Sequence, residues 1–243
     1  FDVDHAPPVM TVSEDAAATL TPADLGSAYA YVYHSWTSSL ARIAGFNASD
    51  RSLHFASEMP DNRFNAGSGH RFRVVNAFTP SAPSRGLAPG TFVFDTITRN
   101  VTFRPLQPTE AAVIEVIVPR LASVIDIAAG THDVAIDSVD VAFARGDLSM
   151  CLDRSCDGQS AAAVTSAAVE VHGAERVTIA NSRVEHTGAW GVWVTDGSVN
   201  VTLSSIQLAD AGTGGVRIGE NRGGAAPPDV AVTHGVLLNN SVL

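Results

Sequence analysis

The sequence predicts an all-β protein: a right-handed parallel β-helix with an inserted or preceding β-sandwich-like region. Three observations lead to this expectation. Short segments alternate apolar and polar residues with a period of two, the pattern of a strand with one buried face. Apolar residues rarely recur at helical spacing. One segment repeats 24 residues later, and internal repeats of about 20–50 residues are typical of stacked architectures.

Residues 1–120 are predicted to form the β-sandwich-like region. Strand alternation is found in residues 28–36, 51–55 and 70–78 and in a hairpin pattern at 90–105. The single candidate for a helical turn is residues 21–28, with Thr21 as its cap.

Residues 121–243 are predicted to form the β-helix, because copies of one segment recur there. Residues 177–188 match 201–212 at a constant offset of 24. An earlier copy at 134–146 aligns at an offset of 43, and a later copy at 230–240 aligns at 29. The extra residues are interpreted as insertions between strands.

Stacking explains such a repeat, because a single copy cannot bury its apolar positions and stacked copies can. Neighbouring parallel strands lie about 4.8 Å apart, so each residue is expected above the residue 24 positions further on. Val, Ile and Leu then form inward ladders. Gly188 and Gly212 are expected at tight corners, where positive φ or close backbone approach is needed. The right-handed sense follows the general rule for parallel crossovers.

Four stretches between residues 29 and 220 also occur in an order found in a known group of proteins. They are VYHSWTSSLARI, RFRVVNAF with GTFVFDTITRNVTFRP, VIVPRLASVIDIAAGTHDVAIDSVDVAF, and HTGAWGVWV with DAGTGGVRIGE. This order resembles the right-handed β-helix proteins grouped around glycoside hydrolase families 141 and 120. The resemblance implies a β-helix interrupted by a smaller β-sandwich, with a sugar site on the coils near the insert.

The chain departs from that group in two places. The group has a bulky aromatic and an acidic residue just before the hairpin, where this chain reads GLAPGTFVFD with Phe92 and no acid ahead of the hairpin. The later coils of the group, rich in His, Asn and Asp, supply part of the site and would lie beyond Leu243. The chain is therefore expected to be a piece truncated at its C-terminal end, with its own missing coils as a partner.

The 24-residue register predicts a polar ladder at one edge of the coils. His186, Asp210 and Asn239 occupy equivalent positions, and Phe143 has the same place one coil earlier. His186 is a candidate substrate-binding residue and Asp210 a candidate catalytic carboxylate. The alternative is that these residues only satisfy the backbone of a turn.

A second ladder follows on the next strand, where Trp193 is expected beside Arg217 and Asp196 beside Glu220. An outward Trp193 and Arg217 could bind a sugar through a flat apolar ring and a fork of donors. The alternative is a cation–π contact under a missing domain. Asp196 and Glu220 are candidate catalytic residues, since adjacent coils would bring them near the separation of about 5–5.5 Å of a retaining glycosidase.

Composition excludes several classes of function. The net charge of −10 argues against nucleic acid as a partner. All fifteen basic residues are Arg, so no mechanism based on a lysine is available. No apolar run approaches the roughly 20 residues of a membrane span. No cofactor and no metal site is predicted, because ligand-rich motifs are missing.

Cysteine and asparagine positions favour a secreted, extracellular protein. Cys151 and Cys156 are separated by four residues in a polar loop and could form a disulfide. The sequence also contains four N-x-S/T glycosylation sequons, at Asn47, Asn100, Asn200 and Asn239. Sequons are used only in secreted chains, on exposed segments.

The leading prediction of function is a secreted glycoside hydrolase acting on plant- or algal-type polysaccharide or oligosaccharide through two carboxylates. Two alternatives remain. One is a non-catalytic surface or adhesive β-helix that binds glycans, and the other is a polysaccharide lyase.

Overall fold

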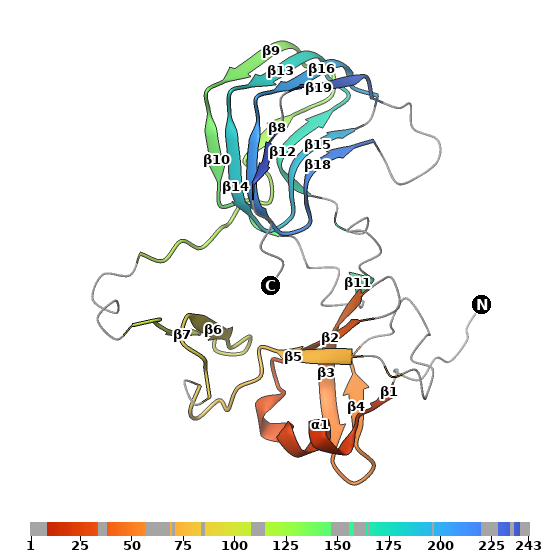
Figure 1. Ribbon diagram of the computed structural model, residues 1–243, viewed down its shortest axis with the longest axis vertical. Helices are drawn as coiled ribbons and strands as arrows, with labels where there is room; N and C mark the ends of the chain where they lie inside the picture. Colours follow the sequence, from red (N-terminus) through yellow and green to blue (C-terminus); the bar gives the residue numbers. More distant parts are fainter. Residues whose placement is uncertain are drawn as a thin grey trace, which may run out of the picture. The chain divides into compact units, whose positions relative to one another are not determined.

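In the computed structural model the regular secondary structure of the described residues is β-strand, apart from one short helix and one 3-10 turn (Figure 1). The predicted all-β class is therefore confirmed. The structure describes residues 9–33, 38–56, 69, 71–83, 86–107, 115–146, 156–157, 164, 166–195, 197–219, 228–233 and 236–238.

The chain divides into two compact units. Unit 1 comprises Phe1–Glu115 and Ser149–Ala163, and unit 2 comprises Val116–Leu148 and Val164–Leu243. The sequence had suggested one boundary near residue 120. In the structure, residues Ser149–Ala163 also belong to unit 1, although they lie in the sequence between two stretches of unit 2.

Unit 1 contains one antiparallel sheet in the order β1-β4-β3-β2-β5, with β11 paired to β3. The hairpin of β6 and β7 forms a separate two-stranded sheet. The bounds are β1 Val9–Thr11, β2 Tyr29–Tyr33, β3 Ser38–Asn47, β4 Ser52–Phe55, β5 Arg71–Val75, β6 Thr91–Phe94, β7 Val101–Arg104 and β11 Cys156–Asp157.

The expected β-sandwich-like region is all-β, as the structure shows. The described strands of unit 1 form the antiparallel sheet and the separate β6–β7 hairpin, and the β-sandwich-like packing stays a prediction. Helix α1 (Glu14–Thr19) was not predicted, although Ser13 caps it by accepting a hydrogen bond from the amide of Ala16. The expected turn after Thr21 is present as η1 (Pro22–Asp24), but the Thr21 side chain makes no capping bond.

The described residues of unit 2 form three parallel sheets of four strands, and the chain visits them in the same order on each circuit. We call them sheet I (β8, β12, β15, β18), sheet II (β9, β13, β16, β19) and sheet III (β10, β14, β17, β20). Figure 1 shows the strands of each sheet side by side. The bounds are β8 Ile125–Ile127, β9 His132–Asp137, β10 Asp140–Ala142, β12 Ala167–His172, β13 Glu175–Ala180, β14 Arg183–Thr187, β15 Trp190–Thr195, β16 Val199–Ser204, β17 Gln207–Ala211, β18 Gly214–Ile218, β19 Val230–Thr233 and β20 Val236–Leu238.

The register predicted from the repeat is confirmed. Val177 pairs with Val201 at the offset of 24, and Val134 pairs with Val177 at 43. Val201 pairs with Val230 at 29. The insertions therefore lie between strands and leave the ladders in register.

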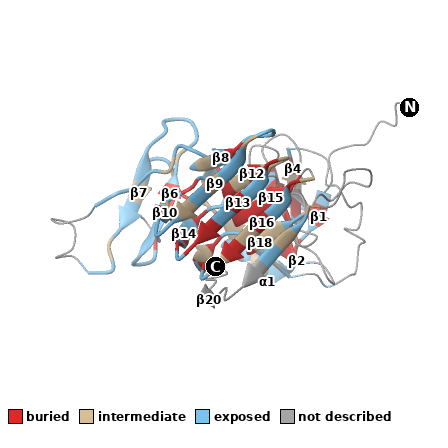
Figure 2. Ribbon diagram, turned by 90° about the horizontal axis from the view of Figure 1, so that it is seen from above, coloured by how far each residue is buried: buried red, intermediate tan, exposed pale blue. Residues whose placement is uncertain are grey.

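Branched apolar side chains fill the interior of unit 2. Val177, Val192, Val194 and Leu203 are completely buried in one cluster. The first circuit is more exposed than the second: β9 has no buried residue, whereas β13 has three (Figure 2). This difference is expected for a circuit at the end of a stack.

Left-handed backbone recurs at equivalent positions in successive circuits. One column consists of Gly130, Gly173 and Gly197. Three further columns have no glycine, and their φ values lie between 50° and 62°: they are Asp133, Arg176 and Asn200; Ser138, Asn181 and Ser205; and Phe143, His186 and Asp210. The expectation that glycine provides the corners is thus only partly right, since the stacked ladders hold other residues in this costly conformation.

Gly188 and Gly212 serve the second purpose that the sequence suggested, close backbone approach. A Cβ on Gly188 would collide with the backbone of Gly146, and one on Gly212 would lie 2.5 Å from the carbonyl oxygen of Gly188. These glycines let three circuits approach one another at one corner.

The close approach predicts that Gly188→Ala destabilises the protein. The methyl group has backbone on its near side, which cannot rotate away, so we expect a loss of about 1–3 kcal/mol in the free energy of unfolding. Denaturant unfolding measures it. Gly26→Ala is the control, because nothing lies within 4 Å of its added Cβ; equal effects of the two changes would contradict the prediction.

Candidate functional site

One column of side chains on the outer side of sheet I contains two carboxylates, an indole and a guanidinium. Asp126 of β8 pairs with Glu170 of β12, which pairs with Trp193 of β15, which pairs with Arg217 of β18. We call this column, together with His172, the sheet I face.

Strand alternation creates this face. Asp126 stands between Ile125 and Ile127, as Glu170 stands between Val169 and Val171, and both Val169 and Val171 are buried. Because alternate residues of a strand point to opposite sides, the residue between two inward apolar ones points out. His172 follows Glu170 by two positions and shares its side.

The three ionisable side chains of the first two circuits lie in contact. The Nε2 atom of His172 is 2.8 Å from Oε2 of Glu170 and 3.8 Å from Oδ1 of Asp126. The other carboxylate oxygen of Glu170 accepts a hydrogen bond of 2.8 Å from the amide of Ala167. Their exposure increases outward: the side chain of Glu170 is 14% exposed, that of His172 27% and that of Asp126 62%.

These groups are also the ones that could hold a metal ion. One ligand atom from each of Asp126, Glu170 and His172 lies within 4.8 Å of the others, the only such group found among the described residues. Two oxygens and one imidazole nitrogen form a mixed donor set.

Trp193 and Arg217 lie together, as the register predicted. The Trp193 ring, however, is not open to solvent as a sugar platform would be. Trp193 is only 5% exposed. The guanidinium carbon of Arg217 lies 4.2 Å from the centre of the Trp193 ring, and Nη1 of Arg217 donates a hydrogen bond to the carbonyl of Val164. The indole N–H of Trp193 donates to the carbonyl of Gly219.

The reason is that an outward side chain in a stack is covered by its neighbours in the next circuit. His172 approaches the edge of Trp193 from one side, with ring centres 6.2 Å apart, and Arg217 covers it from the other. The cation–π contact, which the sequence left as the alternative to a sugar platform, is therefore present.

The predicted ladder at the end of sheet III is confirmed for the described residues. Nδ1 of His186 lies 2.8 Å from Oδ2 of Asp210, and the His186 ring stacks on Phe143 at 5.2 Å between centres. Both His186 and Asp210 are about half exposed. The Asp210 carboxylate thus contacts an imidazole from the preceding circuit. Asn239, Asp196 and Glu220 lie outside the described residues.

A third ladder, on sheet II, pairs acidic side chains with an arginine and a histidine. Arg176 of β13 donates two hydrogen bonds to Asp133 of β9, at 2.5 and 2.9 Å, and Nδ1 of His132 lies 2.8 Å from the same carboxylate. The Arg176 guanidinium, followed by the His132 imidazole, holds the pKa of Asp133 well below its usual range. Arg176 also pairs with Glu175.

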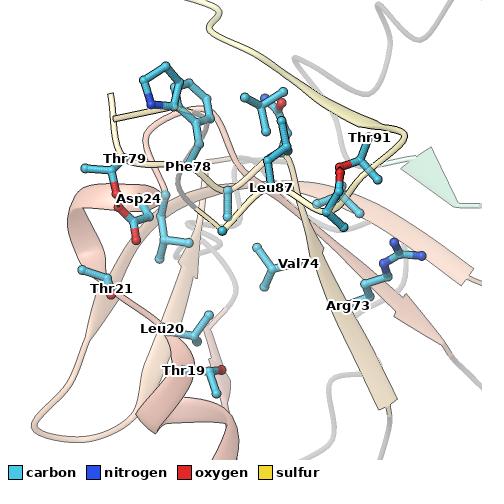
Figure 3. A pocket seen from close by; sticks show the side chains of 18 of the residues that line it. Thr19, Leu20, Thr21, Asp24, Arg73, Val74, Phe78, Thr79, Leu87 and Thr91 are labelled. Carbon is cyan, nitrogen blue, oxygen red and sulfur yellow. Dashed lines mark hydrogen bonds between the residues drawn. The ribbon is translucent and has the colours of Figure 1, made fainter. Parts of the chain in front are cut away.

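Unit 1 contains a cleft of about 750 Å³ between the end of α1, strand β5 and residues 86–93. Figure 3 shows Leu20, Val74 and Leu87 pointing into it and Thr79 beside Asp24. The hydroxyls of Thr19, Thr79 and Thr91 all donate within unit 1, to Ala16, Asp24 and Ala88. The ionisable side chains among the described lining residues are Asp24 and Arg73.

The residues linked to secretion are partly described. Asn47, Asn100 and Asn200 are all exposed, as a glycosylation acceptor must be. Cys156 begins β11, while Cys151 and the side chain of Cys156 lie outside what the structure describes. Glycosylation and the disulfide stay predictions.

Sequence reasoning missed Asp126, Glu170 and His172, although a signal was present. Residues 125–127 and 169–171 each place an acid between two branched apolar residues, just as Trp193 stands between Val192 and Val194. Extending the repeat backward by one strand would have aligned them.

Comparison of this chain with protein-family models, with curated proteins and with solved structures found no match. Within the described part of the chain, no helix is long and apolar enough to cross a membrane.

Removing the cation at position 217 is expected to uncover Trp193. In Arg217→Met the cation–π contact and the bond to Val164 are lost, so stability should fall by about 0.5–2 kcal/mol and acrylamide quenching of tryptophan fluorescence should increase. Arg183→Met is the matched control, because it also removes an arginine from an outer face of unit 2 but breaks an ion pair with Glu185 instead of the contact with Trp193. Unchanged quenching in Arg217→Met would contradict the observed packing.

The Asp133 ladder predicts a dependence on pH. The pKa of Asp133 is depressed by folding, so its contribution to stability is present above the unfolded value of about 3.9 and is lost as pH falls toward the folded value. Carboxyl NMR titration should find that Asp133 in the parent stays ionised well below a pH of about 3.9. In Arg176→Gln the pKa of Asp133 should be higher than in the parent. Identical titration in both chains would exclude Arg176 as the cause.

Proposed function

We propose that unit 2 is a right-handed parallel β-helix. Support comes from three parallel sheets visited in constant order and from residues paired at offsets of 24, 29 and 43. The right-handed sense is taken from the strong preference of parallel crossovers.

We further propose that the protein is a secreted glycoside hydrolase acting on plant- or algal-type polysaccharide. The order of motifs that resembles glycoside hydrolase families 141 and 120 favours this class. The observation that carries the proposal is the carboxylate pair of the sheet I face: one oxygen of Asp126 and one of Glu170 lie within 4.8 Å. Retaining glycosidases hold their two carboxyl groups about 5–5.5 Å apart.

The environments of the two carboxylates favour different roles. Glu170 is held by the Ala167 amide and by His172, which suits a nucleophile that must attack the anomeric carbon from a fixed position. Asp126 is more exposed and suits the acid that protonates the leaving oxygen and then accepts a proton from the incoming water. The bond to the leaving sugar breaks as the glycosyl–Glu170 bond forms. Water then hydrolyses the glycosyl–Glu170 bond, which releases the sugar and restores the free Glu170 carboxylate.

Asp210 stays a candidate for the same chemistry, with His186 as a substrate-binding neighbour. Its carboxylate already lies 2.8 Å from His186, and the other two candidate carboxylates from the sequence, Asp196 and Glu220, are outside the described residues. The pair on the sheet I face is therefore the better supported one.

A non-catalytic glycan-binding rod is the second candidate, favoured by a separate observation. A polar groove of about 490 Å³ crosses successive circuits between sheets II and III and is lined by Asp140, Asn181, Ser182, Arg183, Ser205 and Gln207. Hydroxyl-rich chains bind to such polar surfaces through hydrogen bonds.

Release of reducing sugar from a panel of plant and algal polysaccharides tests the hydrolase proposal. The parent should release reducing ends, and Glu170→Gln should lose at least about 100-fold in rate because it removes a covalent step. Asp210→Asn reports on the other candidate carboxylate.

Glu175→Gln is the matched control, because Glu175 lies on the neighbouring sheet and pairs with Arg176. Full activity of Glu170→Gln and Asp126→Asn would overturn the assignment to the sheet I face. Binding of glycans without any release of reducing ends would favour the rod.

A further inference from the structure

We propose that Asp126, Glu170 and His172 form a binding site for a divalent transition-metal ion, with Zn²⁺ as the best fit. The inference concerns ion binding and does not depend on the proposed hydrolase activity. It begins with the mutual distances: one ligand atom from each of the three residues lies within 4.8 Å of the other two.

The fold holds these ligands in place before any ion arrives. Asp126 and Glu170 are directly paired on neighbouring parallel strands, and His172 stands two positions along the same strand as Glu170. The amide of Ala167 fixes one oxygen of Glu170, which leaves the other oxygen beside His172. Ligands on paired strands are more precisely placed than ligands on loops, so less ordering is required on binding.

The donor atoms favour zinc over calcium or magnesium. Calcium and magnesium prefer sites made only of oxygen, whereas an imidazole nitrogen with carboxylate oxygens suits Zn²⁺. Three protein ligands with one side open to solvent is the arrangement of zinc sites that keep a position for water. The 62% exposure of Asp126 supplies that open side.

Charge provides an independent reason. Two carboxylates lie side by side here, and like charges opposite each other on neighbouring strands are unfavourable. On sheet II, Asp133 is neutralised by two hydrogen bonds from Arg176. On the sheet I face the Arg in the column, Arg217, lies over Trp193 and donates to Val164. A divalent cation would balance the Asp126 and Glu170 charges.

A bound ion would also engage both carboxylates that the proposed hydrolase needs. Metal binding and hydrolysis would then exclude each other at this face. Zn²⁺ would inhibit the enzyme if the proposed function is right, and it would still bind if that proposal is wrong.

Calorimetric titration of the EDTA-treated, dialysed chain with ZnCl₂ tests the site. We expect one equivalent of Zn²⁺ to bind with a Kd below about 1 mM, and His172→Gln, Glu170→Gln and Asp126→Asn each to weaken binding by at least about tenfold. Asp126→Asn keeps the test valid if a change at the more buried Glu170 disturbs folding. CaCl₂ should bind more weakly than ZnCl₂.

His132→Gln is the matched control, since His132 also lies beside an aspartate on an outer face of unit 2 but belongs to the ladder that Arg176 neutralises. It should bind Zn²⁺ like the parent. The site is overturned by the absence of Zn²⁺ binding, by unchanged binding in all three ligand variants, by an equal loss in His132→Gln, or by preference for Ca²⁺.

Discussion

The backbone hydrogen bonds between successive circuits of unit 2 are the constraint on which the rest of this unit depends. They fix each residue beside its equivalent in the next circuit, as in the pairs of Val177 with Val134 and with Val201. Changes of circuit length are tolerated only between strands, where offsets grow from 24 to 29 or 43 without shifting the ladders. One slip would move every inward side chain to the outer face, so the buried valine ladders and the backbone pairing reinforce each other.

The same constraint aligns the outer side chains and decides which of them interact. Left-handed positions recur at equivalent places and bring His186 beside Asp210 and Arg176 beside Asp133. A left-handed conformation is unfavourable for each of these residues taken alone. It persists because the neighbouring strands on both sides determine the path of the backbone, and the stacked side chains then stabilise one another.

The sequence was informative wherever a property depends on register alone, and less so where it depends on contacts across circuits. The pairing of Trp193 with Arg217 could be predicted from their spacing, but the burial of Trp193 could not, because it results from Arg217 and His172 covering the ring. Asp126 and Glu170 each look like a single solvated acid within an alternating strand. Only the pairing of β8 with β12, separated by an insertion in the chain, makes them neighbours. In unit 1 the alternating patterns predicted strands such as β4 and the β6–β7 hairpin, but such patterns do not say whether strands join one sheet or two.

The distribution of charge over the ladders is the strongest reason to place function on sheet I. A parallel stack sets neighbouring side chains about 4.8 Å apart, a distance at which two carboxylates repel unless a cation or a proton intervenes. The ladders on sheets II and III meet this requirement internally, by pairing acid with Arg176 or with His186. On sheet I the two acids are adjacent, with His172 as the partner of both, and the Arg in their column is engaged elsewhere. Because this arrangement gains more from a bound cation or a reacting sugar than its neighbours do, the chemistry of unit 2 is expected there.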